Sequence, residues 1–252
     1  MEEKCGDRIC GQNMKILEAE RLNKRFGGLT AVSSVDLDVK EGEILGLIGP
    51  NGAGKTTLFD LLSGASKADS GVIRFKGHDI AGLKPYQIAR RGLARTFQSV
   101  KIFSSMSVID HVRLGYLFGR LESGGWDEAD RHVGEILEFV GLASIRDGRG
   151  GELILANQKR LEVARALATK PDLLLLDELM AGLTPTEIAE AMGLVKNIAK
   201  RGVTIVMIEH VMKAIMNSCD RIIVLNHGVK IAEGTPEEIA GNRMVIEVYL
   251  GE

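Results

Sequence analysis

Two spacings of hydrophobic residues divide the first two thirds of this 252-residue chain into a strand-rich and a helix-rich part. Apolar runs predict strands over 15–22, 43–49 and 71–77, with one helix at about 55–62. From about residue 85 onward, apolar side chains recur every three or four positions, the spacing of an amphipathic helix. The helices predicted in this stretch lie at 85–92, 107–120, 127–141 and 158–169. They indicate a helical subdomain inserted into the chain.

The last third returns to strands. Continuous apolar runs over 172–177 and 203–210 are typical of buried parallel strands, and a helix predicted over 185–200 connects them as a β-α-β unit. A hairpin over 221–234 turns at 226–228. Two short closing helices are predicted, at 236–241 and 245–252. The pattern as a whole predicts an α/β protein.

Composition narrows the possible functions. Lys and Arg number 32 against 34 Asp and Glu, so a net charge of −2 gives no electrostatic reason to expect a nucleic-acid partner or anionic lipid. Cys5, Cys10 and Cys219 are too few for a disulfide framework and lack the second cluster of a zinc site, which fits a reducing cytosol. No run reaches the roughly 18 apolar residues of a membrane span, and the chain does not begin like a signal peptide. A role at a membrane therefore requires a partner protein.

A glycine-rich loop carries the strongest chemical signal. The stretch "GLIGPNGAGKTT" has Gly49, four residues, then Gly54, Lys55 and Thr56, after a predicted strand and at the start of a predicted helix. Such a loop curls its N–H groups around phosphates, its lysine reaches the β- and γ-phosphates, and its first threonine can hold Mg²⁺. A glycine turn with a chance lysine is the alternative, and the flanking strand and helix disfavour it. The residues predicted to bind nucleotide here are Gly49, Asn51, Gly52, Ala53, Gly54, Lys55, Thr56 and Thr57.

Four further polar residues stand at positions where they can meet the phosphates. Asp177 ends an apolar strand, where a carboxylate is costly unless it meets a cation, and Glu178 after it can polarise water. The alternative interpretation of Asp177 and Glu178 is a solvated acidic turn after the strand. His210 ends the second apolar run, on the side where parallel sheets bind ligands, and can contact the γ-phosphate and hold the attacking water. Gln98 can ligate Mg²⁺ through its amide oxygen. The remaining histidines are predicted to be surface or turn residues: His78, His111, His132 and His227.

The ordered set "GPNGAGKTT", "RTFQ", "LDE" and "IEH", preceded by "KRFGGLTAV", resembles the nucleotide-binding subunit of ABC transporters over roughly 15–252. More narrowly, "FGGLTAV", "ARTFQSVKIF", "MAGLTPTE" and "VYLGE" are similar to the LivG-type ATPase subunits of branched-chain amino-acid importers. The resemblance implies one ABC ATP-binding domain over 1–252. It has a P-loop NTPase (RecA-like) core with an N-terminal antiparallel β subdomain, over 1–98 and 165–252, and an inserted α-helical subdomain over 99–164.

Residue by residue, the resemblance implies that Phe26 stacks on adenine with Val32 nearby. Glu178 would be the general base and His210 the switch histidine. The residues implied around Mg²⁺ are Thr56, Gln98 and Asp177. In two places the chain departs from the family's pattern: Leu179 stands where a proline usually follows the glutamate, and Thr184 replaces the usual acid or amide of the D-loop at 181–184.

The family's signature motif is the largest departure. The family's typical Leu-Ser-Gly-Gly-Gln aligns with "LILAN", which puts Ile154 in place of the serine and Ala156 in place of the glycine. In such proteins this motif faces the ATP of the partner subunit, and Ile154 cannot donate a hydrogen bond to it. We predict that the site completed by this signature is weakened about 10- to 100-fold. The signature residues are Leu153, Ile154, Ala156, Asn157 and Gln158.

The implied function is an ATP- and Mg²⁺-dependent ATPase subunit on the cytoplasmic face of a membrane. It would form a dimer with a second copy of itself or with a different ATPase subunit. The dimer would power permease subunits that import branched-chain or related amino acids, and a periplasmic binding protein would be an indirect partner. The helical part between Gln98 and Leu153 would meet the permeases, with 101–108 the first segment to test. Alternatives are a nucleotide-dependent clamp with little turnover, or an ATPase for urea, amides or lipopolysaccharide export. A soluble ABC protein that acts on DNA or on the ribosome would be expected to carry a long coiled coil or a second cassette, and neither is present in this sequence.

Overall fold

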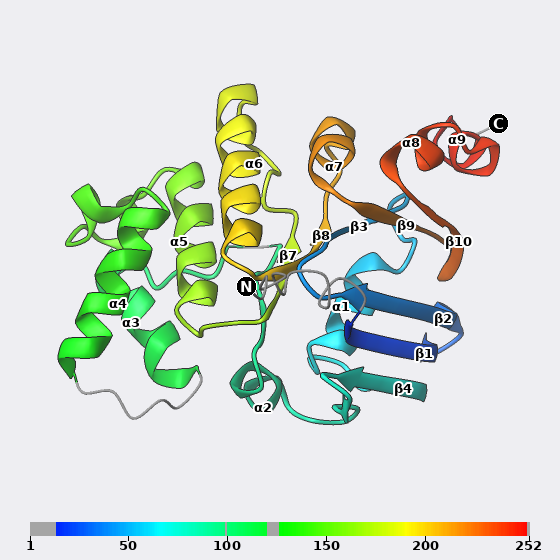
Figure 1. Ribbon diagram of the computed structural model, residues 1–252, viewed down its shortest axis with the longest axis horizontal. Coiled ribbons are helices and arrows are strands. Elements are labelled where there is room, and N and C mark those ends of the chain that lie inside the picture. Colours follow the sequence, from blue (N-terminus) through cyan, green and yellow to red (C-terminus); the bar gives the residue numbers. More distant parts are fainter. Residues whose placement is uncertain (1–13, 99, 120–125, 251–252) are drawn as a thin grey trace, which may run out of the picture.

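The computed structural model describes residues 14–98, 100–119 and 126–250, and it is built on two sheets (Figure 1). The larger sheet has the order β10-β9-β3-β8-β7-β6, in which only β10 pairs antiparallel to its neighbour. Its strands are β3 (Ile44–Ile48), β6 (Leu93–Arg95), β7 (Leu173–Asp177), β8 (Thr204–Ile208), β9 (Arg221–Asn226) and β10 (Val229–Gly234). Every residue of β3, β7 and β8 is buried, as their unbroken apolar runs predict.

The smaller sheet is antiparallel, with the order β2-β1-β4-β5. It consists of β1 (Lys15–Phe26), β2 (Leu29–Lys40), β4 (Ser70–Phe75) and β5 (His78–Asp79). One hydrophobic core fills the space between the two sheets around α1 (Lys55–Leu62). The antiparallel sheet and the P-loop-bearing sheet confirm the predicted fold class.

Helices cover the other face of the larger sheet. A second core joins that face to α5 (Leu155–Leu167), α6 (Pro185–Lys200) and α7 (Met212–Ser218). A third core lies among α3 (Val108–Phe118), α4 (Trp126–Phe139) and α5, at the left of Figure 1. The remaining helices are α2 (Pro85–Arg90), α8 (Pro236–Ala240) and α9 (Arg243–Leu250), and the 3₁₀ turns are Ala143–Ile145 and Gly150–Glu152. The subdomain boundaries at 98/99 and 164/165 stay a prediction.

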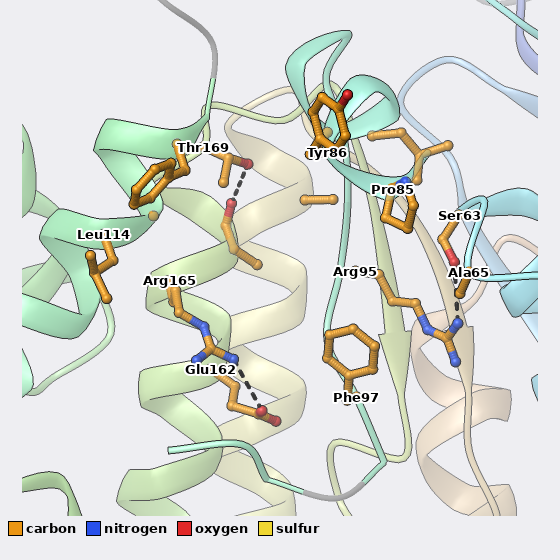
Figure 2. Close-up of a pocket in the computed structure, with 16 residues that line it drawn as sticks. Ser63, Ala65, Pro85, Tyr86, Arg95, Phe97, Leu114, Glu162, Arg165 and Thr169 are labelled. Atoms are coloured by element: carbon orange, nitrogen blue, oxygen red, sulfur yellow. Dashed lines mark hydrogen bonds and ion pairs between the residues drawn. The ribbon is translucent and has the colours of Figure 1, made fainter. Parts of the chain in front are cut away.

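A groove separates the sheet half of the molecule from the third core. It has a volume of about 420 Å³, with α2 and β6 on one side and α3 and α5 on the other (Figure 2). Its aromatic residues are well exposed: Tyr86 by 54%, Phe97 by 38% and Phe118 by 67%. Arg95 of β6 and Arg165 of α5 line opposite walls of the groove.

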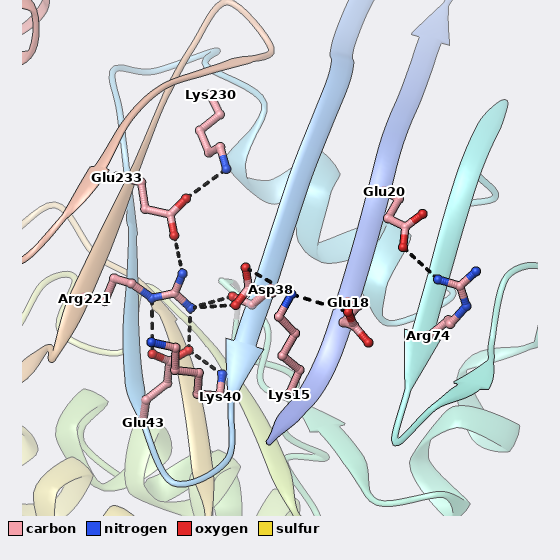
Figure 3. Close-up of polar contacts among 10 residues, drawn as sticks. All are labelled: Lys15, Glu18, Glu20, Asp38, Lys40, Glu43, Arg74, Arg221, Lys230 and Glu233. Carbon is pink, nitrogen blue, oxygen red and sulfur yellow. Dashed lines mark hydrogen bonds and ion pairs between the residues drawn. The ribbon is translucent and has the colours of Figure 1, made fainter. Parts of the chain in front are cut away.

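A partly buried arginine ties the two sheets together at one end of β9. Arg221 donates to the carbonyl oxygen of Asp38 on β2 over 2.6 Å and to Glu43 over 2.7 Å (Figure 3). Its other terminal nitrogen pairs with Glu233 of β10. Because only 15% of the Arg221 side chain is exposed, solvent screens these contacts less than it screens surface ion pairs.

The structure corrects several sequence predictions. The strands β2 and β6 and the helix α7 lie outside the predicted segments. His111 is fully buried, so its prediction as a surface or turn residue is wrong. Its Nε2 accepts from the Phe103 N–H over 3.0 Å and its Nδ1 lies 2.7 Å from the Ser107 carbonyl oxygen, which satisfies both ring nitrogens without water.

Of the three cysteines, Cys219 is buried, whereas Cys5 and Cys10 lie outside the described residues. In the described part of the chain, no helix is both long and apolar enough to cross a membrane.

Candidate active site

The phosphate loop joins β3 to α1, as the sequence predicts, and its glycines are required by geometry. Gly49, Gly52 and Gly54 all have positive φ angles, of 149°, 79° and 98°. A Cβ added to Gly49 would stand 2.1 Å from the Leu225 carbonyl oxygen, and one added to Gly54 would stand 2.3 Å from the Ala31 carbonyl oxygen. No side chain caps the start of α1, so its first N–H groups are open to an anion.

Lys55 is folded back onto the loop. Its ammonium donates to the carbonyl oxygens of Gly49 over 2.7 Å and Pro50 over 3.0 Å. Burial lowers the pKa of Lys55, and the charges of Glu178 and Asp177 oppose that shift. The cation is therefore held beside both acids, within the loop that it would share with a phosphate.

A cavity of about 520 Å³ opens over the loop and gathers most of the predicted site residues. Residues 51–57 line it together with Phe26, Gln98, Glu178 and His210. Val32, Gly49 and Asp177 do not line it. Val32 is fully buried because its side chain points into the core between the sheets, whereas its neighbour Ala31 faces the cavity. Lining residues that sequence reasoning missed are Leu29, Thr30, Ala31 and His227.

Glu178 is held between Gln98 and His210. The Gln98 amide nitrogen donates to Glu178 Oε2 over 2.9 Å, and His210 Nε2 lies 2.8 Å from Glu178 Oε1. Glu178 directly follows β7, and His210 is the second residue after β8. These parallel neighbours end at the same edge of the sheet. The structure thus brings together the three residues predicted for catalysis.

Asp177 has one bound and one open carboxylate oxygen. Arg95 donates to its Oδ2 over 2.8 Å, whereas Oδ1 is buried and has no hydrogen-bond partner among the described residues. Burial raises the pKa of Asp177, and Arg95 opposes that shift. A buried carboxylate oxygen without a donor fits a cation ligand, because such an oxygen is otherwise costly to bury.

The signature residues lie at the start of α5 and do not line the cavity over the chain's own phosphate loop. Ile154 is the N-cap, has no side-chain cap bond and is 65% exposed, whereas Ala156 is buried. Gln158 donates from its side chain to the Leu153 carbonyl oxygen over 2.8 Å. The helix start therefore presents an isoleucine and open N–H groups to the outside, where a second subunit would have to lie to use them.

Comparison with known families decides what this site belongs to. Residues 32–181 match the family described as ABC transporter. The chain belongs to the ABC transporter family. It is an ATP-binding subunit of that family and hydrolyses ATP. Residues 229–252 of this ABC ATPase also match the family described as branched-chain amino acid ATP-binding cassette transporter.

Individual relatives agree with the family match. BraF of Pseudomonas aeruginosa, a high-affinity branched-chain amino acid transport ATP-binding protein, is 40% identical over 250 residues, covering 94% of this chain and 98% of the relative. LivG of Salmonella typhimurium, of the same description, is 42% identical with the same coverage. A solved nucleotide-free ATP-binding cassette from an ABC transporter superposes with a TM-score of 0.87 at 31% identity, covering 95% of this chain and 100% of that one. The solved ADP conformation of an ATP-binding cassette of an ABC transporter superposes with a TM-score of 0.86 at 30% identity, with the same coverage of both chains.

Arg95 is a further residue of this ABC ATPase that sequence reasoning missed. Its side chain is 6% exposed, and its guanidinium joins Asp177 to Asp60 of α1 and to Ser63, the residue that follows α1. It also stacks within 5.6 Å of the Phe59 ring and 5.4 Å of the Phe97 ring. Arg95 therefore connects the wall of the groove in Figure 2 to the acid beside the phosphate loop.

Replacing Arg95 by methionine is expected to lower the free energy of unfolding by about 3 to 5 kcal/mol, because it leaves Asp177 buried without its partner. Urea unfolding measures this loss. The matched control is Arg74→Met, which breaks the exposed pair with Glu20 and should cost less than about 1 kcal/mol. Equal losses in the two variants would contradict the importance of the Arg95–Asp177 pair.

Glu209 makes stability depend on pH. It is 2% exposed and accepts the Met180 N–H over 2.9 Å, and burial raises its pKa to about 7 from 4.5. A raised carboxyl pKa means that the folded state holds the proton more tightly, so this contribution to stability falls as pH rises between about 4.5 and 7.

We expect the stability of the wild type relative to Glu209→Gln to fall by roughly 2 to 3 kcal/mol from pH 5 to pH 8. Urea unfolding of both proteins at each pH gives the difference. A difference that stays constant with pH would show that Glu209 titrates alike in the folded and unfolded states.

Proposed function

We propose that this ABC ATPase powers the import of branched-chain or related amino acids, as the names of its LivG and BraF relatives state for those proteins. The match of residues 229–252 to the branched-chain amino acid family supports this cargo beyond general membership of the ABC transporters. For hydrolysis, the single observation that carries the proposal is Glu178 held between Gln98 and His210 at the phosphate loop.

The loop and its surroundings suit ATP. The phosphates would accept hydrogen bonds from N–H groups of residues 49–57. Lys55 would give up its hydrogen bonds to the two loop carbonyls and donate instead to β- and γ-phosphate oxygens. Phe26, which is 52% exposed and lines the cavity, offers a face for the adenine. The Lys24 ammonium lies 5.3 Å from the centre of that ring.

Mg²⁺ would be held by the open Oδ1 of Asp177, the Thr56 hydroxyl and the Gln98 amide oxygen, and when bound it would offset charge on the phosphate oxygens. Gln98 donates to Glu178 through its amide nitrogen, which leaves its oxygen for this role. The donor set is oxygen only, as Mg²⁺ prefers.

Glu178 would act as the general base. Its carboxylate takes a proton from a water molecule whose oxygen attacks the γ-phosphorus, and ADP leaves with the electrons of the broken P–O bond. Gln98 and His210 hold the two carboxylate oxygens in place, and the exposed His210 ring is positioned to contact the γ-phosphate. The protein thus supplies position and charge rather than a covalent intermediate.

Subunits of this family dimerise and work with permease subunits, and we propose the places where this chain would do so. The start of α5 would meet a second ATPase subunit. The apolar groove of Figure 2 and segment 101–108, in which Phe103 is 57% exposed, would dock the permease on the cytoplasmic face of the membrane. A periplasmic binding protein would act through the permease alone.

Reconstitution tests the cargo. The chain would be assembled with its permease and ATPase partners in proteoliposomes, and ATP-driven uptake of leucine, isoleucine and valine measured against urea and acetamide. We expect uptake of the branched-chain amino acids. Uptake of urea or acetamide in their place would overturn the cargo.

A nucleotide-dependent clamp is the second candidate function. The exposed Ile154 at the start of α5, where the family has a hydroxyl, favours it because the Ile154 side chain cannot donate a hydrogen bond to ATP. In that case binding, not turnover, closes the dimer. Turnover that depends on Glu178 would exclude it.

A further inference from the structure

Lys159, on α5, reaches the backbone of Glu178. Its ammonium donates to the Glu178 carbonyl oxygen over 2.6 Å, and the residue is only 5% exposed. Burial lowers the pKa of Lys159, and the charge of Glu209 opposes that shift more than any other charge does. A buried ammonium aimed at one carbonyl is a costly arrangement to maintain, so the contact calls for an explanation beyond filling the core.

Glu178 requires external support because of its conformation. Its φ of 50° is left-handed, which costs a residue with a Cβ on the order of 1 kcal/mol or more. Hydrogen bonds to β8 and to the residue after it hold the backbone on both sides of Glu178. The Glu178 N–H donates to the Ile208 carbonyl over 2.9 Å, and the Met180 N–H donates to the Glu209 carboxylate. Apart from a 3.3 Å contact with the Ala181 N–H, the Glu178 carbonyl is held from α5 through Lys159.

The same helix touches both surfaces proposed for partners. Ile154 at its start lies five residues before Lys159, about 7.5 Å along a helix. Farther along, Glu162 accepts the Lys101 N–H over 2.9 Å at the beginning of segment 101–108. The Leu155 side chain lies close enough to Gly182 that a Cβ there would stand 3.0 Å from it. A shift of α5 caused by either partner would therefore move the ammonium that holds Glu178.

We propose that Lys159 is a positioning residue for ATP hydrolysis. Through the Glu178 carbonyl it sets where the Glu178 carboxylate stands between Gln98 and His210, and so it links α5 to the hydrolytic site of the same chain. This inference rests on the proposed role of Glu178 as general base and is independent of the cargo. It also assigns a use to the buried Lys159 and Glu209, neither of which lines the nucleotide cavity.

The test compares Lys159→Met with Lys159→Arg in the full-length chain, assembled with its transport partners. We expect kcat for ATP hydrolysis to fall about 10- to 100-fold in K159M, while KM and the Kd for a fluorescent ATP analogue change less than about twofold. K159R keeps a donor for the carbonyl, so its kcat should stay within about threefold of the wild type. Lys196→Met, on the exposed face of α6, is the matched control and should leave kcat unchanged.

The outcomes separate positioning from folding. A K159M protein that melts like the wild type and keeps its kcat would overturn the inference, as would a parallel loss of nucleotide affinity and kcat. If K159M does not fold, Lys159→Gln replaces it, because its amide stays polar beside Glu209 but is one bond too short to reach the carbonyl, and the same loss of kcat is expected. Failure of the proposed function would give a different result, because the wild-type complex itself would then transport no amino acid. That result does not depend on any substitution of Lys159.

Discussion

Glu178→Gln is expected to abolish ATP turnover and leave ATP binding intact. The change keeps the size and shape of the side chain and one oxygen that can accept from Gln98 or His210, but it removes the carboxylate that takes a proton from water. General-base catalysis typically contributes about 10²- to 10⁴-fold, so kcat should fall by at least about 100-fold. Phosphate release from the reconstituted complex measures turnover, and a fluorescent ATP analogue measures affinity.

Glu41→Gln is the control for Glu178→Gln, because Glu41 is an exposed acid in the turn before β3 and should leave turnover unchanged. Turnover within tenfold of the wild type in Glu178→Gln would mean that another group acts as the base. A wild type with no turnover, and with the same ATP-dependent dimerisation as Glu178→Gln, would support the clamp.

Restoring the signature, by Ile154→Ser with Ala156→Gly, should raise ATP turnover about 10- to 100-fold when two copies of this chain form the dimer. A serine at 154 would add a hydrogen bond to a charged phosphate oxygen, worth about 1.5 to 3 kcal/mol, and glycine would remove the methyl group beside it. Ile154 already has the backbone angles of an N-cap, φ −66° and ψ 158°, so serine requires no change of chain path. Steady-state ATPase assays measure the gain.

Two effects of the serine must be separated. As an N-cap it should also stabilise α5 by roughly 1 kcal/mol, which thermal unfolding of the chain would show without nucleotide. Ile154→Ala is the control, since it removes the exposed apolar side chain without adding a hydroxyl. If the restored variant turns over no faster than Ile154→Ala in a dimer of this chain, the signature does not contact the partner's ATP as proposed.

The parts that the sequence predicted well are those encoded locally. The phosphate loop needs one strand, one helix and glycines between them, all within the continuous stretch 44–62, and the structure has them in place. Asp177, Glu178 and His210 were found because buried strands are unbroken apolar runs and polar residues at their ends stand out. The predicted fold class followed from these runs together with the resemblance of the motifs.

What the sequence did not indicate depends on contacts between distant segments. Arg95 meets Asp177 across 82 positions, and Lys159 meets the Glu178 carbonyl only because the fold brings α5 to the residue that follows β7. Val32 was expected near the adenine, but strand alternation turned it into the core and brought Ala31 to the cavity. His111 is different, because the partners of its ring nitrogens, Phe103 and Ser107, are close in the chain; the sequence prediction missed that this helix start encloses the ring.

The turn between β9 and β10 has a consequence for how relatives diverge. At that turn the Gly228 N–H donates to the Ala53 carbonyl of the phosphate loop over 3.0 Å, and the Gly228 carbonyl accepts the Ser33 N–H of β2 over 2.8 Å. Residue 229 is also where the match to the branched-chain amino acid family begins. The segment that matches this family therefore begins directly beside the phosphate loop, and its Tyr249 also forms a hydrogen bond with the Gly49 backbone. A substitution in this segment can thus change nucleotide affinity while every phosphate-binding residue stays the same.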